Sequence, residues 1–392
     1  MASAKGASLA DLRTQNATTV LDVIRSQAPI SRAQISRQVG LTRPTVSSAL
    51  ETLLEAGLVR ESEPVAGQPH YGATFFELAP DASYFVAFDI DRRQFRAILV
   101  DALGNPVAGH EAHQPIGRPA ELVEQVRRVS LDLCTGAGIE QHRIVLAIVG
   151  VPAAVDPNDG RLRLSAYRLL EGFALGPAIA AALGIPVFVD NDVNLAAIGE
   201  RATGAARDVS DFAYLTIGRN VGSGIVLRDE ILRGVHGAAG EVDAPVTDAE
   251  HLSASPAADA FEALARQALT TADAAFGPTP AAVFAAAARG DALAERILAE
   301  QARRIAEVIA VLCRVLDLSM VVLGGGIGRR CGPILDQITS EVARLLPFPP
   351  RVLISSLKDR PVLVGATTVG VHESMSLVTP RRLAQVIRRA AI

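Results

Sequence analysis

One carboxylate in the middle of the chain stands where it could act on a hydroxyl group. Asn191 and Asp192 follow the apolar run PVFVD and precede a helical pattern, so they close a predicted strand and open the next helix. From such a junction a carboxylate can accept a hydrogen bond from a hydroxyl or remove its proton. The alternative is structural, because aspartate at a helix start is also a competent N-cap.

A second group of polar residues, near the N-terminus, suits contact with DNA. The segment TRPTVSSALETLLEAG predicts a helix with a proline in its first turn, one apolar face and one small polar face. Short hydroxyls and arginines on and beside that polar face could reach base edges and phosphates. The candidate DNA-contacting residues are Arg32, Arg37, Thr42, Arg43, Pro44, Thr45, Ser47 and Ser48.

The surrounding elements predict a winged helix-turn-helix over residues 16–78. A first amphipathic helix is followed by a second, which opens on the capping-box pattern of Ser31 and Gln34 and turns at Gly40 into the third. LVRESEP and HYGATFFEL then predict two strands around a loop, the wing, in which Gln68 is a further DNA-contacting candidate. The same pattern could also describe a three-helix packing module with a hairpin.

The remainder of the chain predicts two α/β halves of similar construction. YFVAFDI and FRAILVD predict a hairpin, followed by a helix from Pro119 and the strands IVLAIVG and PVFVD. FAYLTIG and SGIVLRD predict a second hairpin, followed by helices within 256–318 and the strands MVVLGGG and RVLISS. Strand-helix alternation favours mainly parallel connections within each half, and a cleft between the halves is the usual place for a ligand.

Composition narrows the class of protein. With 392 residues, 49% hydrophobic, 4% aromatic and no tryptophan, the chain predicts two or three α/β domains with aliphatic cores. Three scattered cysteines favour a reducing cytoplasm, and no apolar run reaches the roughly 18 residues of a membrane helix, so we expect a cytoplasmic protein without a membrane partner. Because the net charge is −4, any DNA-binding surface must be local.

Four segments together resemble the ROK family, whose name joins repressors and sugar kinases. They are IVGVPAAVD, PVFVDNDVNLAAIGERATGAA, YLTIGRNVGSGIVLRDEILRGVHGAAGEV and VVLGGGI. The resemblance spans nearly the whole chain. It implies an α/β protein in which the N-terminal winged helix-turn-helix precedes two actin-like (ribonuclease H-like) α/β subdomains with a cleft between them. It also places Asp192 at the kinases' catalytic-base position and Glu241 at a carboxylate that contacts sugar hydroxyls, with Asn191 beside them.

This organisation divides the chain into five expected segments. They are a flexible N-terminal arm at 1–15, the DNA-binding domain at 16–78, the first actin-like subdomain at 79–190, the second at 191–375, and a C-terminal helix at 376–392 that packs on the body. The last segment, TPRRLAQVIRRAAI, predicts a basic amphipathic helix.

Both phosphate-binding loops depart from the kinase pattern. The first reads Asp89-Ile90-Asp91-Arg92-Arg93 and the second Gly218-Arg219-Asn220-Val221-Gly222, with bulky or charged side chains where the family's kinases have glycines and a hydroxyl. Phosphoryl transfer needs close backbone donors and room for the phosphates. We therefore predict that the protein is not an enzyme and that Asp192 is a vestigial base.

The arginines in these loops have two interpretations. If Arg93 and Arg219 face the cleft, they could bind an anionic effector such as a sugar phosphate or sugar acid. Alternatively they pair with Asp91 and fill the former nucleotide site.

No cofactor or metal is expected. The family's zinc element is missing, because Glu241-Val242-Asp243-Ala244 lacks the usual histidine and no cysteine follows nearby, although His236 and His251 remain in the region. Gly324-Gly325-Gly326 survives on the adenosine side, but a glycine turn after a strand is commonly structural.

These features predict a DNA-binding transcriptional regulator, a repressor in preference to an activator. We expect a homodimer or higher homo-oligomer that binds double-stranded operator DNA and responds to a sugar or sugar-derived effector in its cleft. The effector stays open, because Tyr167 and Arg168 stand near where the family offers an asparagine to the sugar. Two alternatives remain: an active ATP-dependent sugar kinase with an N-terminal DNA-binding module, and a constitutive DNA-binding protein with a vestigial cleft.

Overall fold

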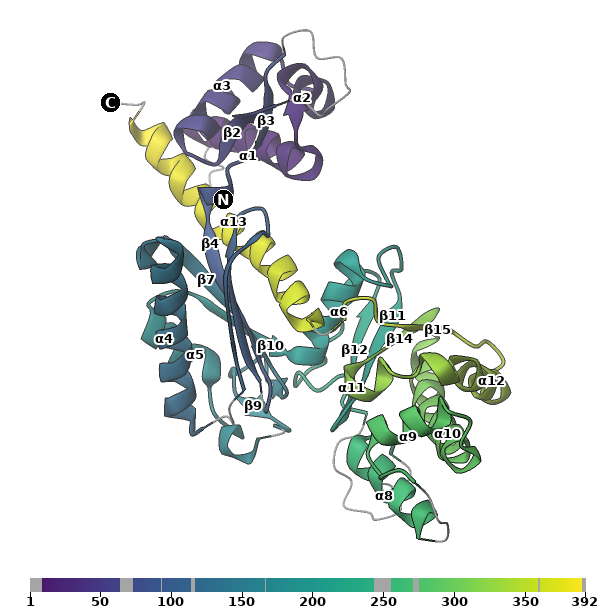
Figure 1. Ribbon diagram of the computed structural model, residues 1–392. Helices are drawn as coiled ribbons and strands as arrows, with labels where there is room; N and C mark the ends of the chain where they lie inside the picture. The colour runs from purple at the N-terminus through teal and green to yellow at the C-terminus, as the bar shows by residue number, and fades with distance from the viewer. Residues whose placement is uncertain are drawn as a thin grey trace, which may run out of the picture.

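The computed structural model describes residues 9–63, 73–92, 94–113, 117–165, 167–242, 255–270, 275–358 and 360–389. An N-terminal module of three helices and a small sheet stands on one end of a larger two-part body (Figure 1). The module contains α1 (Leu9–Gln27), β1 (Ile30–Ser31), α2 (Arg32–Val39), α3 (Arg43–Glu55), β2 (Val59–Ser62) and β3 (Phe75–Leu78).

Local capping fixes the helix-turn-helix as the sequence predicts. The Ser31 backbone N–H donates to Gln34 Oε1 at 2.9 Å and Gln34 N donates back to Ser31 Oγ at 3.4 Å, which completes the capping box of α2. Gly40 ends α2 with φ of 66°, and Thr42 caps α3 by accepting from Thr45 N. The winged helix-turn-helix fold is therefore confirmed, while Gln68 and the wing loop lie outside the described residues.

The expected flexible arm is wrong from Leu9 onward. Residues 9–15 form the first turns of α1, although the helix buries side chains only from Ala17. No glycine or proline interrupts this stretch, and Asp11 favours a helix start, so helix propensity extends the element beyond its packed face. Residues 1–8 lie outside the description.

The first half of the body is a five-stranded sheet in the order β10-β7-β4-β5-β6. It contains β4 (Tyr84–Ile90), β5 (Phe95–Asp101), β6 (Pro106–Ala112), α4 (Pro119–Ala137), β7 (Ile144–Val151), β8 (Ala154–Val155), β9 (Leu162–Arg163), α5 (Leu175–Leu183) and β10 (Val187–Asn191). The strand β6 was not predicted, because it is an exposed edge strand with a proline, a glycine and a histidine instead of an apolar run.

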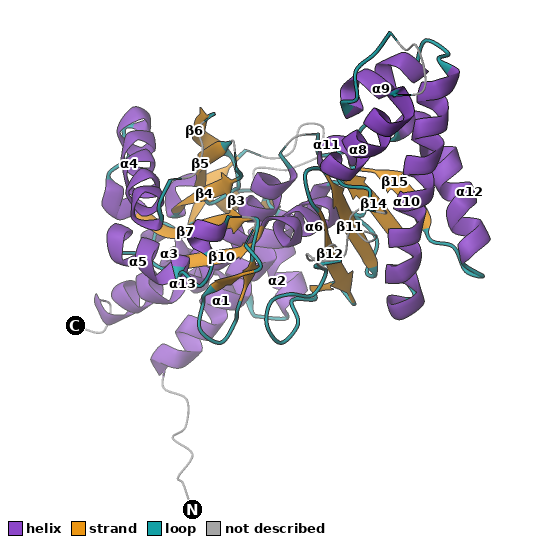
Figure 2. Cartoon of the chain, turned by 90° about the horizontal axis from the view of Figure 1, so that it is seen from below, coloured by secondary structure: helices purple, strands orange, loops and turns teal. Residues whose placement is uncertain are grey.

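The second half repeats this plan in the order β13-β12-β11-β14-β15. It contains α6 (Asp192–Thr203), β11 (Phe212–Ile217), β12 (Val221–Leu227), β13 (Glu230–Ile231), α8 (Ala258–Leu269), α9 (Pro280–Ala287), α10 (Ala292–Leu316), β14 (Met320–Gly324), α11 (Gly325–Gly328), α12 (Leu335–Leu345), β15 (Arg351–Ile354) and α13 (Pro361–Arg389). Figure 2 shows α6 between the two sheets, with α4 and α5 outside the first and α10 and α12 outside the second.

The expectation of mainly parallel connections is wrong. Each five-stranded sheet pairs two neighbours in parallel and two antiparallel. The antiparallel pairs come from strands that follow one another through short turns, and such turns can join only antiparallel neighbours. The parallel pairs are those separated by helices.

The C-terminal helix also differs from the expectation. Helix α13 is one continuous element, so the expected boundary at residue 376 falls inside it. Its second part packs on the N-terminal module in addition to the body. Met375, Val378, Leu383, Val386 and Ile387 share a buried core with α1 and α3, and this core also contains Ala82 and Ala102 of the body. Its first part lies against β4, β7 and α6.

Glycines permit the close crossing of α6 and α13. A Cβ on Gly365 would lie 1.7 Å from the Leu195 carbonyl oxygen, and one on Gly199 would lie 2.7 Å from the Pro361 carbonyl oxygen. Neither position accommodates a side chain at this separation. Among the described helices, none combines the length and the apolar character that a membrane crossing requires.

Candidate functional site

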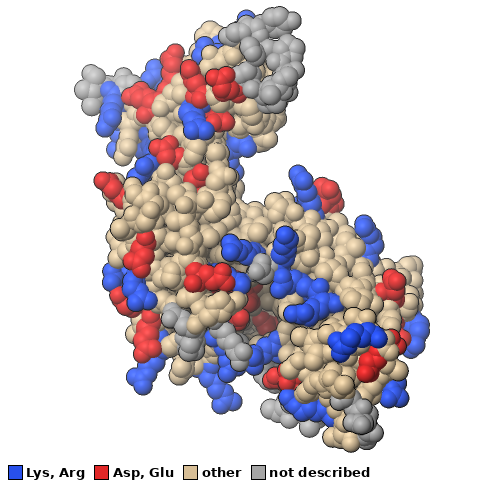
Figure 3. Space-filling view, in the orientation of Figure 1, with Lys and Arg blue, Asp and Glu red and all other residues tan. Residues whose placement is uncertain are grey.

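A cleft between the two halves contains four of the five predicted ligand-binding residues: Asn191, Asp192, Arg219 and Glu241. One cavity of about 450 Å³ is lined by Asn191, Asp192 and Glu241 on one side and by the β11–β12 turn on the other. A smaller cavity of about 170 Å³ adjoins it and shares Asp91 and Asp192. Figure 3 shows basic side chains gathered beside the hollow between the halves, with acidic atoms inside it.

The strand-to-helix junction uses Asn191 and not Asp192 as its cap. Asn191 Oδ1 accepts hydrogen bonds from Val193 N at 2.7 Å and Asn194 N at 3.3 Å. The Asn191 amide group donates to Glu241 Oε1 at 3.1 Å and to the Ala153 carbonyl at 3.2 Å. Asn191 thus connects the end of β10 to the loop that carries Glu241. The N-cap role that the sequence offered for Asp192 is filled by Asn191.

Asp192 lies in an environment that favours its neutral form. Burial, together with the nearby carboxylates of Asp89 and Asp91, raises its pKa to about 8, and one hydrogen bond from Val193 N opposes the shift. Burial also raises the pKa of Asp89, to about 6, although Arg96 at 3.5 Å opposes the shift. At neutral pH the Asp192 carboxyl therefore holds a proton and can donate a hydrogen bond.

The loop that carries Glu241 is fastened to β12 through Gly240. Gly240 has φ of 92°, and a Cβ there would lie 1.8 Å from the Ser223 carbonyl oxygen. Ser223 N donates to the Gly240 carbonyl at 2.8 Å, which fastens this loop to β12. Burial raises the pKa of Glu241, and the hydrogen bond from Asn191 opposes that shift.

Beside the cleft lies an ion pair that the sequence analysis did not identify. Arg233 Nη2 and Nε contact Asp190 Oδ2 at 2.7 and 3.1 Å, and Asp190 is 3% exposed. Asp190 also accepts from the Asn191 and Asn194 nitrogens, so it orders the start of α6. One signal was available: an aspartate that ends an apolar strand requires a partner when it is buried.

The β4–β5 and β11–β12 connections, where the family resemblance places the phosphate loops, are tight hairpin turns. Asp91 N donates to the Gln94 carbonyl, and Gly218 N donates to the Asn220 carbonyl. Arg219 is exposed and lines the larger cavity, whereas Arg93 lies outside the described residues. Asp91 accepts from Tyr167 Oη at 3.4 Å, and no described cation forms an ion pair with it. The expected ion pair between Arg219 and Asp91 is thus not formed. Arg168, which the sequence analysis placed near the sugar site, lines neither cavity.

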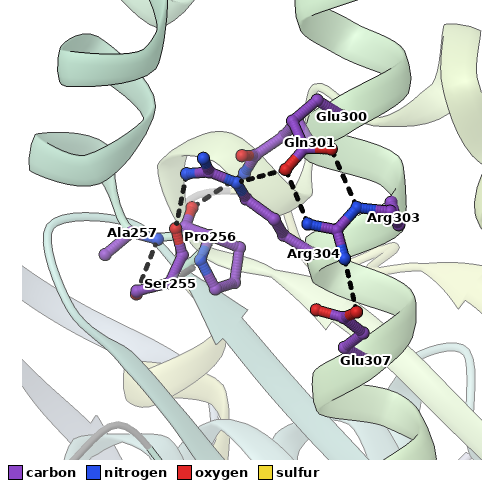
Figure 4. A network of polar contacts seen from close by, with 8 residues as sticks. All are labelled: Ser255, Pro256, Ala257, Glu300, Gln301, Arg303, Arg304 and Glu307. Carbon is purple, nitrogen blue, oxygen red and sulfur yellow. Dashed lines mark hydrogen bonds and ion pairs between the residues drawn. The ribbon is translucent and has the colours of Figure 1, made fainter. Parts of the chain in front are cut away.

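A polar network connects the segment before α8 to α10 (Figure 4). Gln301 Nε2 donates to the Pro256 carbonyl at 2.8 Å, and Arg304 donates to the Ser255 carbonyl at 3.3 Å. These bonds hold the start of α8 on α10, and Ala258 N donates from there to the Gly218 carbonyl at 2.7 Å.

Packing accounts for the first two glycines of the surviving run, whereas Gly326 has open space at its Cβ position. A Cβ on Gly324 would lie 2.0 Å from Tyr214 Oη, and one on Gly325 would lie 2.6 Å from the Ile217 carbonyl oxygen. Close packing therefore supports a structural role for Gly324 and Gly325. His236 is exposed, while Asp243, Ala244 and His251 lie outside the described residues, so the absence of a zinc site stays a prediction.

The predicted DNA-contacting residues lie near one another on α2 and α3. Arg37, Thr42, Arg43, Pro44 and Ser48 are exposed, and Thr45 and Ser47 are partly exposed. Thr42 and Thr45 share a hydroxyl contact of 2.8 Å at the cap. Arg32 lies 5.9 Å above the ring of Phe76, toward the small sheet. Within the described chain, neither Arg37 nor Arg43 forms an ion pair, so both are available to phosphates.

Two family models match the chain. The ROK family model matches residues 85–370, and the IclR helix-turn-helix domain model matches residues 14–63.

Curated relatives and solved structures agree with this order of domains. A xylose repressor of Caldicellulosiruptor bescii is 23% identical over 388 residues, with 93% of this chain and 97% of the relative covered. A structure of a ROK family transcriptional regulator, a homologue of the Escherichia coli MLC protein, has a TM-score of 0.77 at 20% identity and covers 96% of this chain and 99% of its own. A ROK hexokinase from Thermus thermophilus covers 74% of this chain and 99% of its own, with a TM-score of 0.63 and 25% identity. The chain spans only 57 to 59% of the length of three other curated relatives.

Proposed function

The chain belongs to the ROK family, and from this premise we propose that it is a DNA-binding transcriptional repressor controlled by a sugar or sugar-derived effector. The observation that carries the proposal is the exposed polar end of α3, where Arg43, Pro44 and Ser48 project from a capped helix-turn-helix. A recognition helix reads DNA through such an N-terminal turn. Acting on operator DNA, the protein would work in the cytoplasm.

The cleft supplies the proposed effector site. Asn191, Asp192 and Glu241 line one wall, and their amide, protonated carboxyl and carboxylate groups are donors and acceptors of the kind that sugar hydroxyls need. Arg219 would add a cation for an anionic effector, and Arg93 stays a candidate for the same role. The name of the Caldicellulosiruptor relative makes D-xylose the first effector to try.

The proposed switch needs two copies of the chain. A homodimer would place two recognition helices in major grooves about 34–36 Å apart. An effector changes operator affinity only by as much as it prefers one state of the cleft, and a tenfold change corresponds to about 1.4 kcal/mol.

Kinase activity is the second candidate, because Asp192 and Glu241 line one cavity and a ROK hexokinase shares the fold of the body. Three features oppose it. Asp91 lines the cavity as a carboxylate that would repel ATP phosphates, Arg219 and Asn220 occupy the second loop, and Gly324 and Gly325 are accounted for by packing.

One experiment separates the two functions. Double-stranded DNA is selected from a random pool with the full chain, and binding to it is measured with and without D-xylose, D-glucose and N-acetyl-D-glucosamine. A sugar that weakens DNA binding at least about tenfold supports the repressor. Phosphorylation of any of these sugars by ATP, lost in Asp192→Asn, would establish the kinase instead.

A further inference from the structure

Helix α13 touches both of the sites described above. At its N-terminal end, Pro361 and Val362 line the smaller cavity of the cleft. Near its C-terminal end, Leu383, Val386 and Ile387 are buried in the core of the N-terminal module. Its 29 residues correspond to a rod of about 43 Å, and Figure 1 shows it running from beside α6 to the module.

The first part of α13 lies between the two halves of the body. On one side it packs on β4 and β7 of the first sheet, and on the other on α6, which covers β11 and β12 of the second. The fit is close on both sides: a Cβ on Gly370 in α13 would lie 2.1 Å from the Phe85 ring in β4, and one on Gly365 would lie 1.7 Å from the Leu195 carbonyl oxygen in α6. A change in the angle between the halves must therefore displace α13 relative to at least one of them.

The second part of α13 holds the C-terminal end of the recognition helix. Arg382 Nη1 donates to the Gly57 carbonyl at 3.0 Å and to the Ala56 carbonyl at 3.3 Å. Ala56 is the C-cap of α3, so these carbonyls have no partner within the helix, and a guanidinium there also complements the helix dipole. Gly57 has φ of 62°, and a Cβ there would lie 3.3 Å from the same Nη1 atom.

Pro380 separates these two parts. A proline inside a helix has no N–H for the carbonyl four residues earlier, which weakens the backbone ladder at that point. Movement of the segment before Pro380 therefore reaches the segment after it mainly through the side-chain contacts that flank Pro380.

We propose that α13 carries the state of the cleft to the DNA-binding module, and that Arg382 is the positioning residue that fastens the recognition helix to it. The inference deepens the proposed function, since it names the route by which a ligand in the cleft would alter DNA binding. The proposal requires that a change at the N-terminal end of α13 alters contacts at its C-terminal end, which the position of the helix alone does not establish.

The test is a double-mutant cycle in the full-length chain that needs no known ligand. Val362→Ala loosens the cleft end of α13, and Arg382→Gln removes the bond to α3 while keeping a polar side chain. Amide hydrogen exchange in the last turns of α3 is measured in the wild type, both single variants and the double variant. Arg381→Gln is the matched control, because Arg381 is exposed and carries the same charge. Val311→Ala, at a 57% exposed valine, controls for the other substitution.

The expected result is that Val362→Ala raises exchange in α3 about threefold or more, and that this effect disappears in the Arg382→Gln background. Independent sites would combine to within about twofold. The same increase in both backgrounds, or none in α3, overturns the inference. If Val362→Ala does not fold, Val362→Thr, which preserves the shape of the side chain, replaces it.

The same variants tell this inference apart from the proposed function. Binding to the selected DNA should change at least about threefold in Val362→Ala and much less when Arg382→Gln is also present. If the wild type binds no DNA but α3 still responds to Val362→Ala through Arg382, the repressor proposal fails and the coupling stands. If the wild type binds DNA and α3 does not respond, only the coupling fails.

Discussion

The recognition helix and the cleft hold their polar groups in opposite ways. On α3 and α2, Arg43 and Arg37 are exposed and form no ion pair within the described chain. In and beside the cleft, Asp89 and Asp190 are 8% and 3% exposed, and each contacts an arginine. The first surface keeps its charges hydrated until a partner arrives, whereas the second must neutralise or pair them within the fold.

This difference separates two kinds of recognition. Hydrated cations attract phosphates at a distance and cost the fold little, so losing one should alter binding and not stability. Buried carboxylates are maintained by partners or by a raised pKa, so losing a partner should alter stability as well as the site.

The largest expected effect is on the paired side. Arg233→Ala leaves Asp190 buried with N–H donors only, so we expect the free energy of unfolding in urea to fall by ~2–4 kcal/mol. Arg207→Ala, at an exposed arginine, is the control and should change it by less than about 0.5 kcal/mol. Equal effects of the two substitutions would remove the contrast between cleft and surface.

On the exposed side, Arg43→Ala should weaken binding to the selected DNA by ~1–3 kcal/mol, read by fluorescence anisotropy at fixed salt. The melting temperature should not change, because Arg43 contacts no carboxylate in the described chain. Arg13→Ala on α1 provides an exposed arginine outside the recognition helix. A large loss of stability in Arg43→Ala would contradict the comparison.

The smallest effect sharpens the comparison through pH. Since the pKa of Asp192 is about 8 in the fold and near 4 when unfolded, the native state binds the extra proton between these values. Its contribution to stability therefore decreases as pH rises from about 4 to 8. Asp192→Asn should remove that slope and be more stable than the wild type at pH 8 by ~1–2 kcal/mol, less than the full linkage value because solvent screens part of the repulsion. Parallel stability curves for the two proteins would show that Asp192 does not titrate in this range.

Much of the N-terminal module could be predicted because its signals are local. The capping box at Ser31, the turn at Gly40 and the buried stripe of α3 depend on residues within one or two turns of each other. The start of α1 was missed for the complementary reason: residues 9–15 have helix propensity but bury no side chain, so no apolar pattern marks them.

The candidate cleft could be predicted only in part. Asn191 and Asp192 stand at a strand-helix junction that the chain itself displays, and Glu241 follows from the family resemblance. Arg233 reaches Asp190 across 43 residues of sequence, and the pKa of Asp192 is raised first by burial and then by Asp89 and Asp91, about 100 residues earlier. No short sequence pattern indicates either the Arg233–Asp190 ion pair or the raised pKa of Asp192.

Alone, the amino-acid order determined most of the helices and strands, the faces that they bury, and the bulky or charged residues in segments 89–93 and 218–222. Only the tertiary structure decided that the last helix packs on the first module, that Arg382 reaches the end of α3, and that three aspartates share one cleft. Periodicity and capping act over a few residues, while burial, ion pairing and pKa depend on groups that only folding brings together.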